Sequence, residues 1–357
     1  MSGWVDVASA DEIKPGHPVH VEVDGAAIAV FKLGQSFYAI EDVCTHDGGR
    51  LTGGCIEKDQ IVCPRHGARF SIKTGEALTA PAYEPTATFP IRIENGIVQE
   101  PLVKIFVMGS NKWLEGDTYP LPYTQMQRWN LGSGGKANTS KGDGTLSLDL
   151  PAASSVPDRY VYDPGDPTPN PDFYEESAED EKKVRPVEEK RREAEANHEK
   201  VTSGRSDILI YQTKTLEKPL TFAGPVSAVL YASSSATDTD WFMRLVWIKK
   251  DGKVFPLGEG KIRARFRKST KNPELLRPGE VYEYALDLWQ TGITIPAGDA
   301  IRVEVASASF PLFSRNLNTG GLNEKETRFI KAEQTIFHDQ KYPSHVLLPV
   351  IPEDRLK

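Results

Sequence analysis

Residues 44–66 read CTHDGGRLTGGCIEKDQIVCPRH, and the rest of the chain is organised around this stretch. Cys44 and His46 form a C-x-H pair, and Cys63 and His66 form a C-x-x-H pair, with sixteen residues between the two pairs. Thiolate sulfur and imidazole nitrogen are both strong ligands of transition metals. Two short loops that each offer one sulfur and one nitrogen therefore predict a metal site.

The way in which the ligand types are paired favours one kind of centre. Zinc fingers group their cysteines in one loop and their histidines in another. Here each loop offers one of each, as a Rieske [2Fe–2S] centre requires, with both cysteines on one iron and both histidines on the other. CTHDGG and CPRHGARF resemble the cluster loops of Rieske ferredoxins that serve ring-hydroxylating dioxygenases. The resemblance implies one [2Fe–2S] cluster held by Cys44, His46, Cys63 and His66, and a zinc site is the alternative.

Four further positions indicate which class of Rieske protein the sequence resembles. High-potential members carry an additional cysteine in each loop, joined by a disulfide, and hydroxyl side chains after the second histidine. Gly49 and Arg65 stand at the first two places, and Ala68 and Phe70 at the other two. Fewer hydrogen bonds to the cluster leave its reduced state less stabilised, which lowers the reduction potential. The resemblance therefore implies the low-potential ferredoxin class.

The composition predicts a globular chain of two domains. With 357 residues, 39% of them hydrophobic, the chain is too long for a single comfortable core. No stretch approaches the roughly eighteen apolar residues of a membrane span, and the first residues lack the features of a signal peptide. We therefore expect a cytoplasmic protein with no membrane partner. Cys55 is the remaining cysteine, and we expect it to be a small packed side chain.

The charge is distributed unevenly along the chain. The net charge is −7, of which −6 falls in residues 1–103 and −1 in the remainder. An acidic region around the predicted metal site suits docking onto a basic redox partner, either a reductase or an oxygenase. The same charge argues against nucleic acid as a partner.

Short strand patterns surround the predicted metal site. The last of them, GEALTAPAYEPTATFPIRIENGIVQE, resembles the end of a Rieske ferredoxin. We therefore expect a small antiparallel β domain over residues 1–100. Its expected strands are Trp4–Val7, Val19–Val23, Ala26–Phe31, Ser36–Glu41, Gln60–Val62, Ala68–Ile72, Thr88–Ile93 and Gly96–Gln99.

Strand patterns begin again after Pro101, with no convincing amphipathic helix among them. VYEYALDL and IRVEVASASF alternate between two faces, which is typical of half-buried strands. We expect an antiparallel sandwich or jelly roll, so that the whole chain is all-β. The expected strands are Asp207–Gln212, Val226–Ser233, Phe242–Lys249, Lys253–Leu257, Lys261–Arg267, Val281–Leu288, Ala300–Ser307 and Val346–Ile351.

Residues 175–200 interrupt this pattern with EESAEDEKKVRPVEEKRREAEANHEK, a run of mixed charges with few apolar side chains. The segment can form an exposed helix stabilised by i,i+4 ion pairs, or stay disordered. Neither state has much of a core to join. We therefore expect a solvated insertion within the second domain.

From Pro101 to its end the chain resembles the C-terminal, non-catalytic jelly-roll domain of X-Pro dipeptidyl-peptidases and cocaine-esterase-type serine hydrolases. The resemblance rests on IFVMGSNKWLEGDTYP, TDTDWFMRLVWIKKDGKVFPLGEGKIRARFR, FPLFSRNLNTG and IFHDQKYPSHVLLPVIP, which follow one another in the family's order. It implies a galactose-binding-like β-sandwich over residues 101–357.

The catalytic motifs of such enzymes have no counterpart in this sequence. The hydrolases place their nucleophile on a G-x-S-x-G elbow, and no G-x-S-x-G occurs in the chain, since Gly132-Ser133-Gly134 does not complete it. A Rieske oxygenase needs two histidines and a carboxylate for catalytic iron. The D-x-x-H-x-x-x-x-H signature is absent, and His338 and His345 are expected to be structural.

Three functions follow from these observations. The first is an electron carrier, in which a Rieske domain is fused to a sandwich that docks it onto a partner or assembles it, a homo-oligomer being one form of assembly. The second is an accessory or binding module derived from a hydrolase, in which the cluster is structural or regulatory. The third is a hydrolase that acts through residues outside the known motifs. The sequence favours the first and predicts no catalytic residues.

Overall fold

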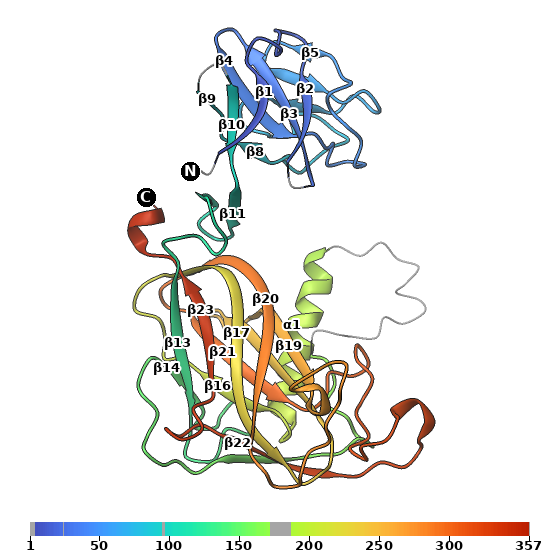
Figure 1. Cartoon of the computed structure of the whole chain (residues 1–357), viewed down its shortest axis with the longest axis vertical. Helices are drawn as coiled ribbons and strands as arrows, with labels where there is room; N and C mark the ends of the chain where they lie inside the picture. The colour runs from blue at the N-terminus through green and yellow to red at the C-terminus, as the bar shows by residue number, and fades with distance from the viewer. Residues whose placement is uncertain (1–3, 24, 95–96, 172–186, 357) are drawn as a thin grey trace. The chain divides into compact units, whose positions relative to one another are not determined.

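The computed structural model describes residues 4–23, 25–94, 97–171 and 187–356 (Figure 1). They form two compact units, one of Met1–Ile105 with Leu114–Pro122, and the other of Phe106–Trp113 with Tyr123–Lys357. The chain changes unit twice within the hairpin of β11 (Val103–Val107) and β12 (Lys112–Gly116), and a third time after Pro122. The boundary that we expect near residue 100 stays a prediction.

Three small sheets make up most of the first unit (Figure 1). Their strand orders are β1-β10-β9, β2-β3-β4-β8 and β5-β6-β7, and all their pairs are antiparallel. The strands are β1 Trp4–Ser9, β2 Val19–Val23, β3 Ala26–Leu33, β4 Ser36–Glu41, β5 Ile56–Glu57, β6 Gln60–Val62, β7 Arg69–Ser71, β8 Thr88–Phe89, β9 Arg92–Glu94 and β10 Ile97–Pro101. One loop with a predicted ligand pair joins β4 to β5, and the other joins β6 to β7.

The second unit is a β-sandwich, as the strand pattern predicts (Figure 1). Its sheet has the order β15-β22-β17-β23-β13-β14-β16-β21-β18-β19, and β20 pairs with β17. Among these pairs β14–β16 is parallel. The strands are β13 Gln125–Gly132, β14 Thr145–Ser147, β15 Asp158–Tyr162, β16 Leu209–Gln212, β17 Leu220–Ser234, β18 Asp240–Ile248, β19 Val254–Arg263, β20 Tyr282–Ile295, β21 Ala300–Ala306, β22 Ala332–Phe337 and β23 His345–Val350.

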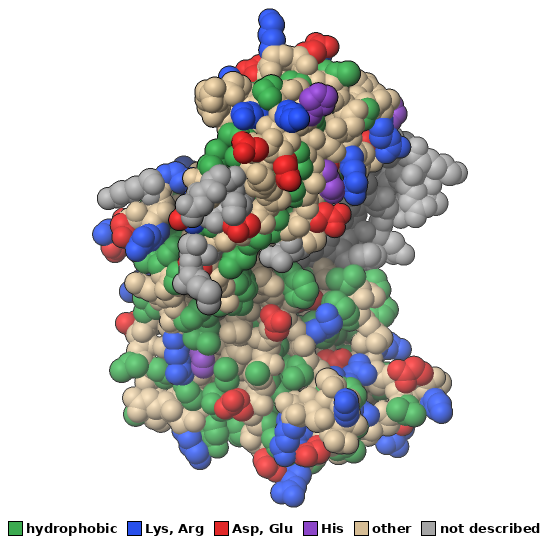
Figure 2. Space-filling model, turned by 45° about the horizontal axis from the view of Figure 1, so that its top comes forward, with side chains coloured by type: hydrophobic (Ala, Val, Ile, Leu, Met, Phe, Trp, Pro, Cys, Tyr) green, Lys and Arg blue, Asp and Glu red, His purple; other side chains and the backbone are tan. Residues whose placement is uncertain are grey.

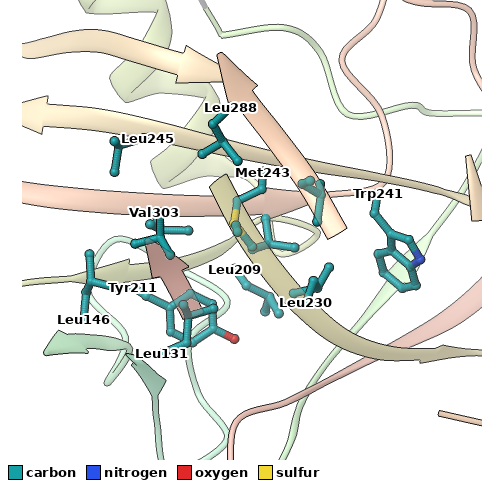
Figure 3. Close-up of a cluster of buried hydrophobic side chains, with 14 of the residues drawn as sticks. Leu131, Leu146, Leu209, Tyr211, Leu230, Trp241, Met243, Leu245, Leu288 and Val303 are labelled. Carbon is teal, nitrogen blue, oxygen red and sulfur yellow. The ribbon is translucent and has the colours of Figure 1, made fainter. Parts of the chain in front are cut away.

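One continuous hydrophobic core holds the sandwich together (Figure 3). Leu209, Met243 and Val303, from β16, β18 and β21, are fully buried. They belong to the same cluster as Leu131 and Leu230, which come from β13 and β17. Alternate residues of each strand therefore enter this core, which is the pattern that the sequence shows most clearly in β20 and β21.

The structure differs from the expected strands in several places. The expected strand Thr88–Ile93 is divided between β8 and β9, which belong to different sheets. Lys253–Leu257 and Lys261–Arg267 are predicted as two strands, but most of this region is the single strand β19, which pairs with β18 from end to end. In the sequence, Gly258 and Gly260 look like the residues of a turn. In the structure, they lie within the strand, where their lack of a side chain allows close contact with the backbone of β20 at residues 287 and 288. Strands β13, β14, β15 and β22 have no counterpart among the expected strands, because polar residues interrupt their apolar pattern.

The described part of the charged segment forms a helix, which is one of the two expected states, but it is not wholly solvated, because His198 is 1% exposed and its Nε2 lies 2.9 Å from Oε1 of buried Glu304. Helix α1 covers Val187–Gly204, while residues 172–186 lie outside the described residues. Val201 packs with Ile208, Ile210 and Ala306 in a small apolar cluster. The helix extends past residue 200, and its buried apolar residue Val201 lies just beyond the run of mixed charges. Among the described residues, no helix combines the length and apolar character needed to cross a membrane.

A matched pair of leucine substitutions tests the core of the sandwich. Leu230 is fully buried, whereas Leu150 is 86% exposed. Leu230→Ala should lower the free energy of unfolding of the sandwich by about 2–5 kcal/mol, because it removes buried methyl groups and leaves a cavity. Leu150→Ala should change it by less than about 0.5 kcal/mol. Guanidinium denaturation followed by tryptophan fluorescence measures both, and equal effects would contradict the core described here.

Candidate metal centre

The two loops that carry the predicted ligands close in the same way. In the first loop the N–H of Gly48 donates to the carbonyl of Cys44 at 2.8 Å. In the second the N–H of Gly67 donates to the carbonyl of Cys63 at 3.0 Å. Both glycines have positive φ, 72° and 76°, a conformation that side chains other than glycine rarely adopt. Each Cys–His pair is therefore presented by a tight glycine-closed turn.

The two cysteines point into the interior of the first unit. Cys44 and Cys63 have relative exposures of 0% and 1%, and they belong to the same apolar cluster as Leu51, Ile61 and Phe70. Burial raises the pKa of the Cys44 thiol, and the neighbouring Cys63 sulfur raises it further. Two adjacent buried thiols favour a cation that takes the place of their protons, because metals bind the thiolate form.

The two histidines lie at the surface of the same site. His46 and His66 are exposed, and their ring centroids are 4.9 Å apart with the planes at 86°. Asp47 lies between the two ligand types. One of its carboxylate oxygens is within 4.8 Å of the Cys44 and Cys63 sulfurs, and one is within the same distance of ring nitrogens of both histidines. The structure thus brings the four predicted ligands together.

The donor set fits a [2Fe–2S] cluster of the Rieske type. Such a cluster needs two thiolates at one iron and two imidazoles at the other. Here the sulfurs are buried and the imidazoles are exposed, so that one end of the site is enclosed by protein and the other faces solvent. A zinc finger does not require this separation.

A buried aspartate that the sequence analysis missed holds the first loop in place. Asp42 is fully buried and accepts hydrogen bonds from the backbone N–H groups of Leu51 and Thr52, at 2.8 and 2.7 Å. The Thr52 hydroxyl donates to its other oxygen at 2.7 Å, and His20 Nδ1 lies 2.7 Å from that oxygen. Asp42 therefore ties both ends of the Cys44 loop together. The sequence places it two residues before Cys44, but no motif there indicates the partners that it finds.

Positions 49 and 65, where high-potential Rieske proteins carry their bridging cysteines, lie side by side. A Cβ on Gly49 would come within 2.5 Å of Arg65 Cδ. The stem of the arginine therefore occupies the space beside Gly49, and its Nε lies 3.2 Å from the Asp47 carboxylate. The hydrogen bond from the N–H of Gly49 lowers the pKa of Asp47 most, burial opposes this shift, and the charge of Arg65 adds to it, so that the pKa is lowered. An ion pair joins the two loops here.

Ala68 and Phe70 are both fully buried beneath the second loop. Neither side chain has a polar hydrogen, so neither can donate a hydrogen bond to a sulfur atom nearby.

The expectation for Cys55 is wrong, because this cysteine is exposed rather than packed. It lies at the end of the first loop, where the chain returns to the surface before β5.

His338 of the sandwich lies in a buried polar network. Its Nε2 is 3.1 Å from Asp158 Oδ2, and its Nδ1 is 3.0 Å from the Ser155 hydroxyl. Asp158 also accepts hydrogen bonds from the hydroxyls of Ser133 and Tyr211, at 2.6 and 2.8 Å. Burial alone would raise the pKa of Asp158, but the hydrogen bonds from His338 and Ser133 outweigh it and lower the pKa. A hollow of about 360 Å³ adjoins the network.

His345 does not belong to this network. Its Nδ1 lies 2.7 Å from the carbonyl oxygen of Pro343.

Known proteins resemble each half of the chain. Residues 3–90 match the Rieske [2Fe-2S] domain, and residues 95–347 match the X-Pro dipeptidyl-peptidase C-terminal non-catalytic domain. The ferredoxin component of the naphthalene 1,2-dioxygenase/salicylate 5-hydroxylase systems of Ralstonia sp is 39% identical over 92 residues, which are 26% of this chain and 88% of that protein. The Rieske match and these ferredoxin relatives imply one [2Fe–2S] cluster.

The relatives of the sandwich are longer proteins. Cocaine esterase of Rhodococcus sp. (strain MB1 Bresler) is 35% identical over 291 residues, which are 78% of this chain but 48% of that protein. The crystal structure of an aminopeptidase from the marine sediment archaeon Thaumarchaeota archaeon matches 71% of this chain and 40% of its own, with 25% identity and a TM-score of 0.59. The chain thus spans about half the length of cocaine esterase. It belongs, over most of its length, to the family of the X-Pro dipeptidyl-peptidase C-terminal non-catalytic domain, and residues 3–90 belong to the Rieske [2Fe-2S] family, together with dioxygenase ferredoxins.

Proposed function

We propose that this protein is a low-potential electron carrier whose [2Fe–2S] cluster is held by Cys44, His46, Cys63 and His66. The observation that carries the proposal is the arrangement of these side chains, with two buried thiols behind two exposed imidazoles on paired glycine-closed loops. When bound, the cluster accepts and releases one electron. The buried sulfur end excludes water, and the exposed imidazoles of His46 and His66 provide the shortest route for that electron to a partner.

The partner that we propose is a reductase or oxygenase of the kind that dioxygenase ferredoxins serve. The surface near His46 suits a protein partner, because Tyr83 is 83% exposed. Tyr83 precedes Glu84, whose carbonyl accepts a hydrogen bond from the Thr45 hydroxyl at 2.7 Å, next to His46. Aromatic side chains at the centre of an interface bury much area at low entropic cost.

For the β-sandwich we propose a role in docking or assembly. The family description as non-catalytic supports this role, and a homo-oligomer is one assembly that it would allow. Basic and acidic side chains are mixed on the face seen in Figure 2, and neither sign forms a single large patch there. Such a surface suits a protein partner better than nucleic acid. A place in the cytoplasm remains a prediction.

A cysteine pair tests the cluster. Cys63→Ser should remove the Rieske electron paramagnetic resonance signal and the two irons and two sulfides per chain, because it deletes one of two thiolates at one iron. Cys55→Ser is the matched control, since Cys55 is exposed and lies outside the site, and it should keep both. Metal analysis that finds one zinc and no sulfide in the parent protein would refute the proposal.

The reduction potential tests the assignment to the low-potential class. It should lie below about 0 mV, within a Rieske span of about −150 to +300 mV. The physical reason is that Ala68 and Phe70 have no hydroxyl to donate to the cluster. In addition, Gly49 and Arg65 stand where a bridging disulfide would need two cysteines. Protein-film voltammetry measures the value, and a potential above about +150 mV would contradict this class.

The protein should not hydrolyse X-Pro dipeptide amides or small esters. Acyl transfer needs an accessible nucleophile, a base and an oxyanion hole. Ser155, His338 and Asp158 are aligned by hydrogen bonds, but His338 is only 2% exposed, and the carboxylate already binds the hydroxyls of Ser133 and Tyr211. We therefore expect this network to stabilise the sandwich.

The test is reaction with a serine-specific fluorophosphonate probe, alongside a chromogenic X-Pro substrate. Background rates and no labelling are expected for the parent protein. Labelling that disappears in Ser155→Ala, together with saturable turnover, would replace this expectation with a hydrolase site in the sandwich.

A further inference from the structure

Asp47 is placed at the centre of the proposed cluster site without being one of its ligands. It follows His46 directly, and its side chain is 16% exposed. Its Oδ2 lies 3.1 Å from Nδ1 of His66, and one of its carboxylate oxygens lies within 4.8 Å of the Cys44 and Cys63 sulfurs. The N–H of Gly49 donates to its Oδ1 at 3.1 Å, which fixes the direction of the carboxylate. A full negative charge is therefore held against both ends of the ligand set.

One cation lies close to this carboxylate. Nε of Arg65 is 3.2 Å from Asp47 Oδ2, and the arginine side chain is 57% exposed. The absence of a side chain at Gly49 leaves room for its stem, so the pair depends on glycine at that position. Because Arg65 faces solvent more than Asp47 does, water screens its charge more strongly, and it offsets only part of the charge of the aspartate.

We propose that Asp47 and Arg65 form a charge pair that sets the reduction potential of the cluster, with Asp47 lowering it and Arg65 partly restoring it. The proposal rests on the electron-carrier function proposed above. Reduction adds one electron, supplied by the partner reductase, and neither makes nor breaks a bond. The added negative charge is repelled by the nearby carboxylate, so the oxidised state is favoured and the potential falls. Asp47 is a positioning and tuning residue, not a ligand.

This pair would act in addition to the missing hydroxyl donors. Ala68 and Phe70 lower the potential by failing to stabilise the reduced state, whereas Asp47 lowers it by direct repulsion. The two causes are separable by experiment, because the first concerns groups that are absent and the second a group that can be removed. Substituting the aspartate should therefore raise the potential even though the sequence around it is otherwise unchanged.

The test compares isosteric substitutions of two aspartates at one fixed pH. Asp47→Asn should favour the reduced state at least tenfold, which corresponds to a rise of about 59 mV for one electron. Asp59→Asn is the matched control, because Asp59 is an exposed aspartate of the same unit that pairs with Lys73 at 3.1 Å. It should shift the equilibrium less than twofold. Protein-film voltammetry gives the potential, and electron paramagnetic resonance shows whether the cluster is intact.

The opposite substitution checks the sign. Arg65→Gln should lower the potential, since it removes the cation and leaves the carboxylate unopposed. If the Asp47→Asn protein does not retain a cluster, the shift measured for Arg65→Gln tests the proposal by itself. A shift in Asp47→Asn no larger than in Asp59→Asn, or a rise in Arg65→Gln, overturns this proposal while the electron-carrier function stands. A parent protein without a Rieske signal overturns that function instead.

Discussion

Two sulfur atoms must be held side by side in an apolar interior, and the first unit is built to meet this constraint. Cys44 and Cys63 lie among buried aliphatic and aromatic side chains, where an isolated thiolate would be unfavourable. Loops that enter such an interior must find partners for their own backbone groups. The buried carboxylate of Asp42 supplies acceptors for two N–H groups of the first loop, and the glycine-closed turns satisfy the carbonyls of both cysteines.

The same constraint explains why the imidazoles are outside. A C-x-H or C-x-x-H pair on a tight turn cannot bury both side chains, because the turn itself forms the surface of the unit. The thiols therefore face the core, and His46 and His66 face solvent. The polarity of the site, enclosed at sulfur and open at nitrogen, results from loop geometry. It is also the polarity that electron exchange with a docked protein requires.

The sandwich meets its requirements in another way. Its strands bury a continuous apolar core, and its buried polar groups are paired in networks such as that of Asp158, His338 and Ser155. In an interior of low polarity an unpaired carboxylate is costly, whereas one with several donors can rigidify the fold. The hydrogen bonds that link Ser155 to His338 and His338 to Asp158 thus satisfy buried polar groups of the sandwich.

Local sequence determined the ligand residues to expect, most strands of both units and the two family resemblances. These follow from short-range rules, namely the spacing of Cys and His within a loop and the alternation of apolar residues along a strand. Only the tertiary structure decided which residues support the site. Asp42 reaches across its own loop, Arg65 crosses to Asp47, and Asp158 finds His338, because each contact joins segments whose separation in sequence carries no periodic signal. The packing of α1 could not be predicted for the same reason. Its buried residue Val201 packs against Ile208, Ile210 and Ala306, which come from β16, β21 and the residue before β16. Long-range contacts of this kind depend on how the sheets fold over one another, which no local pattern states.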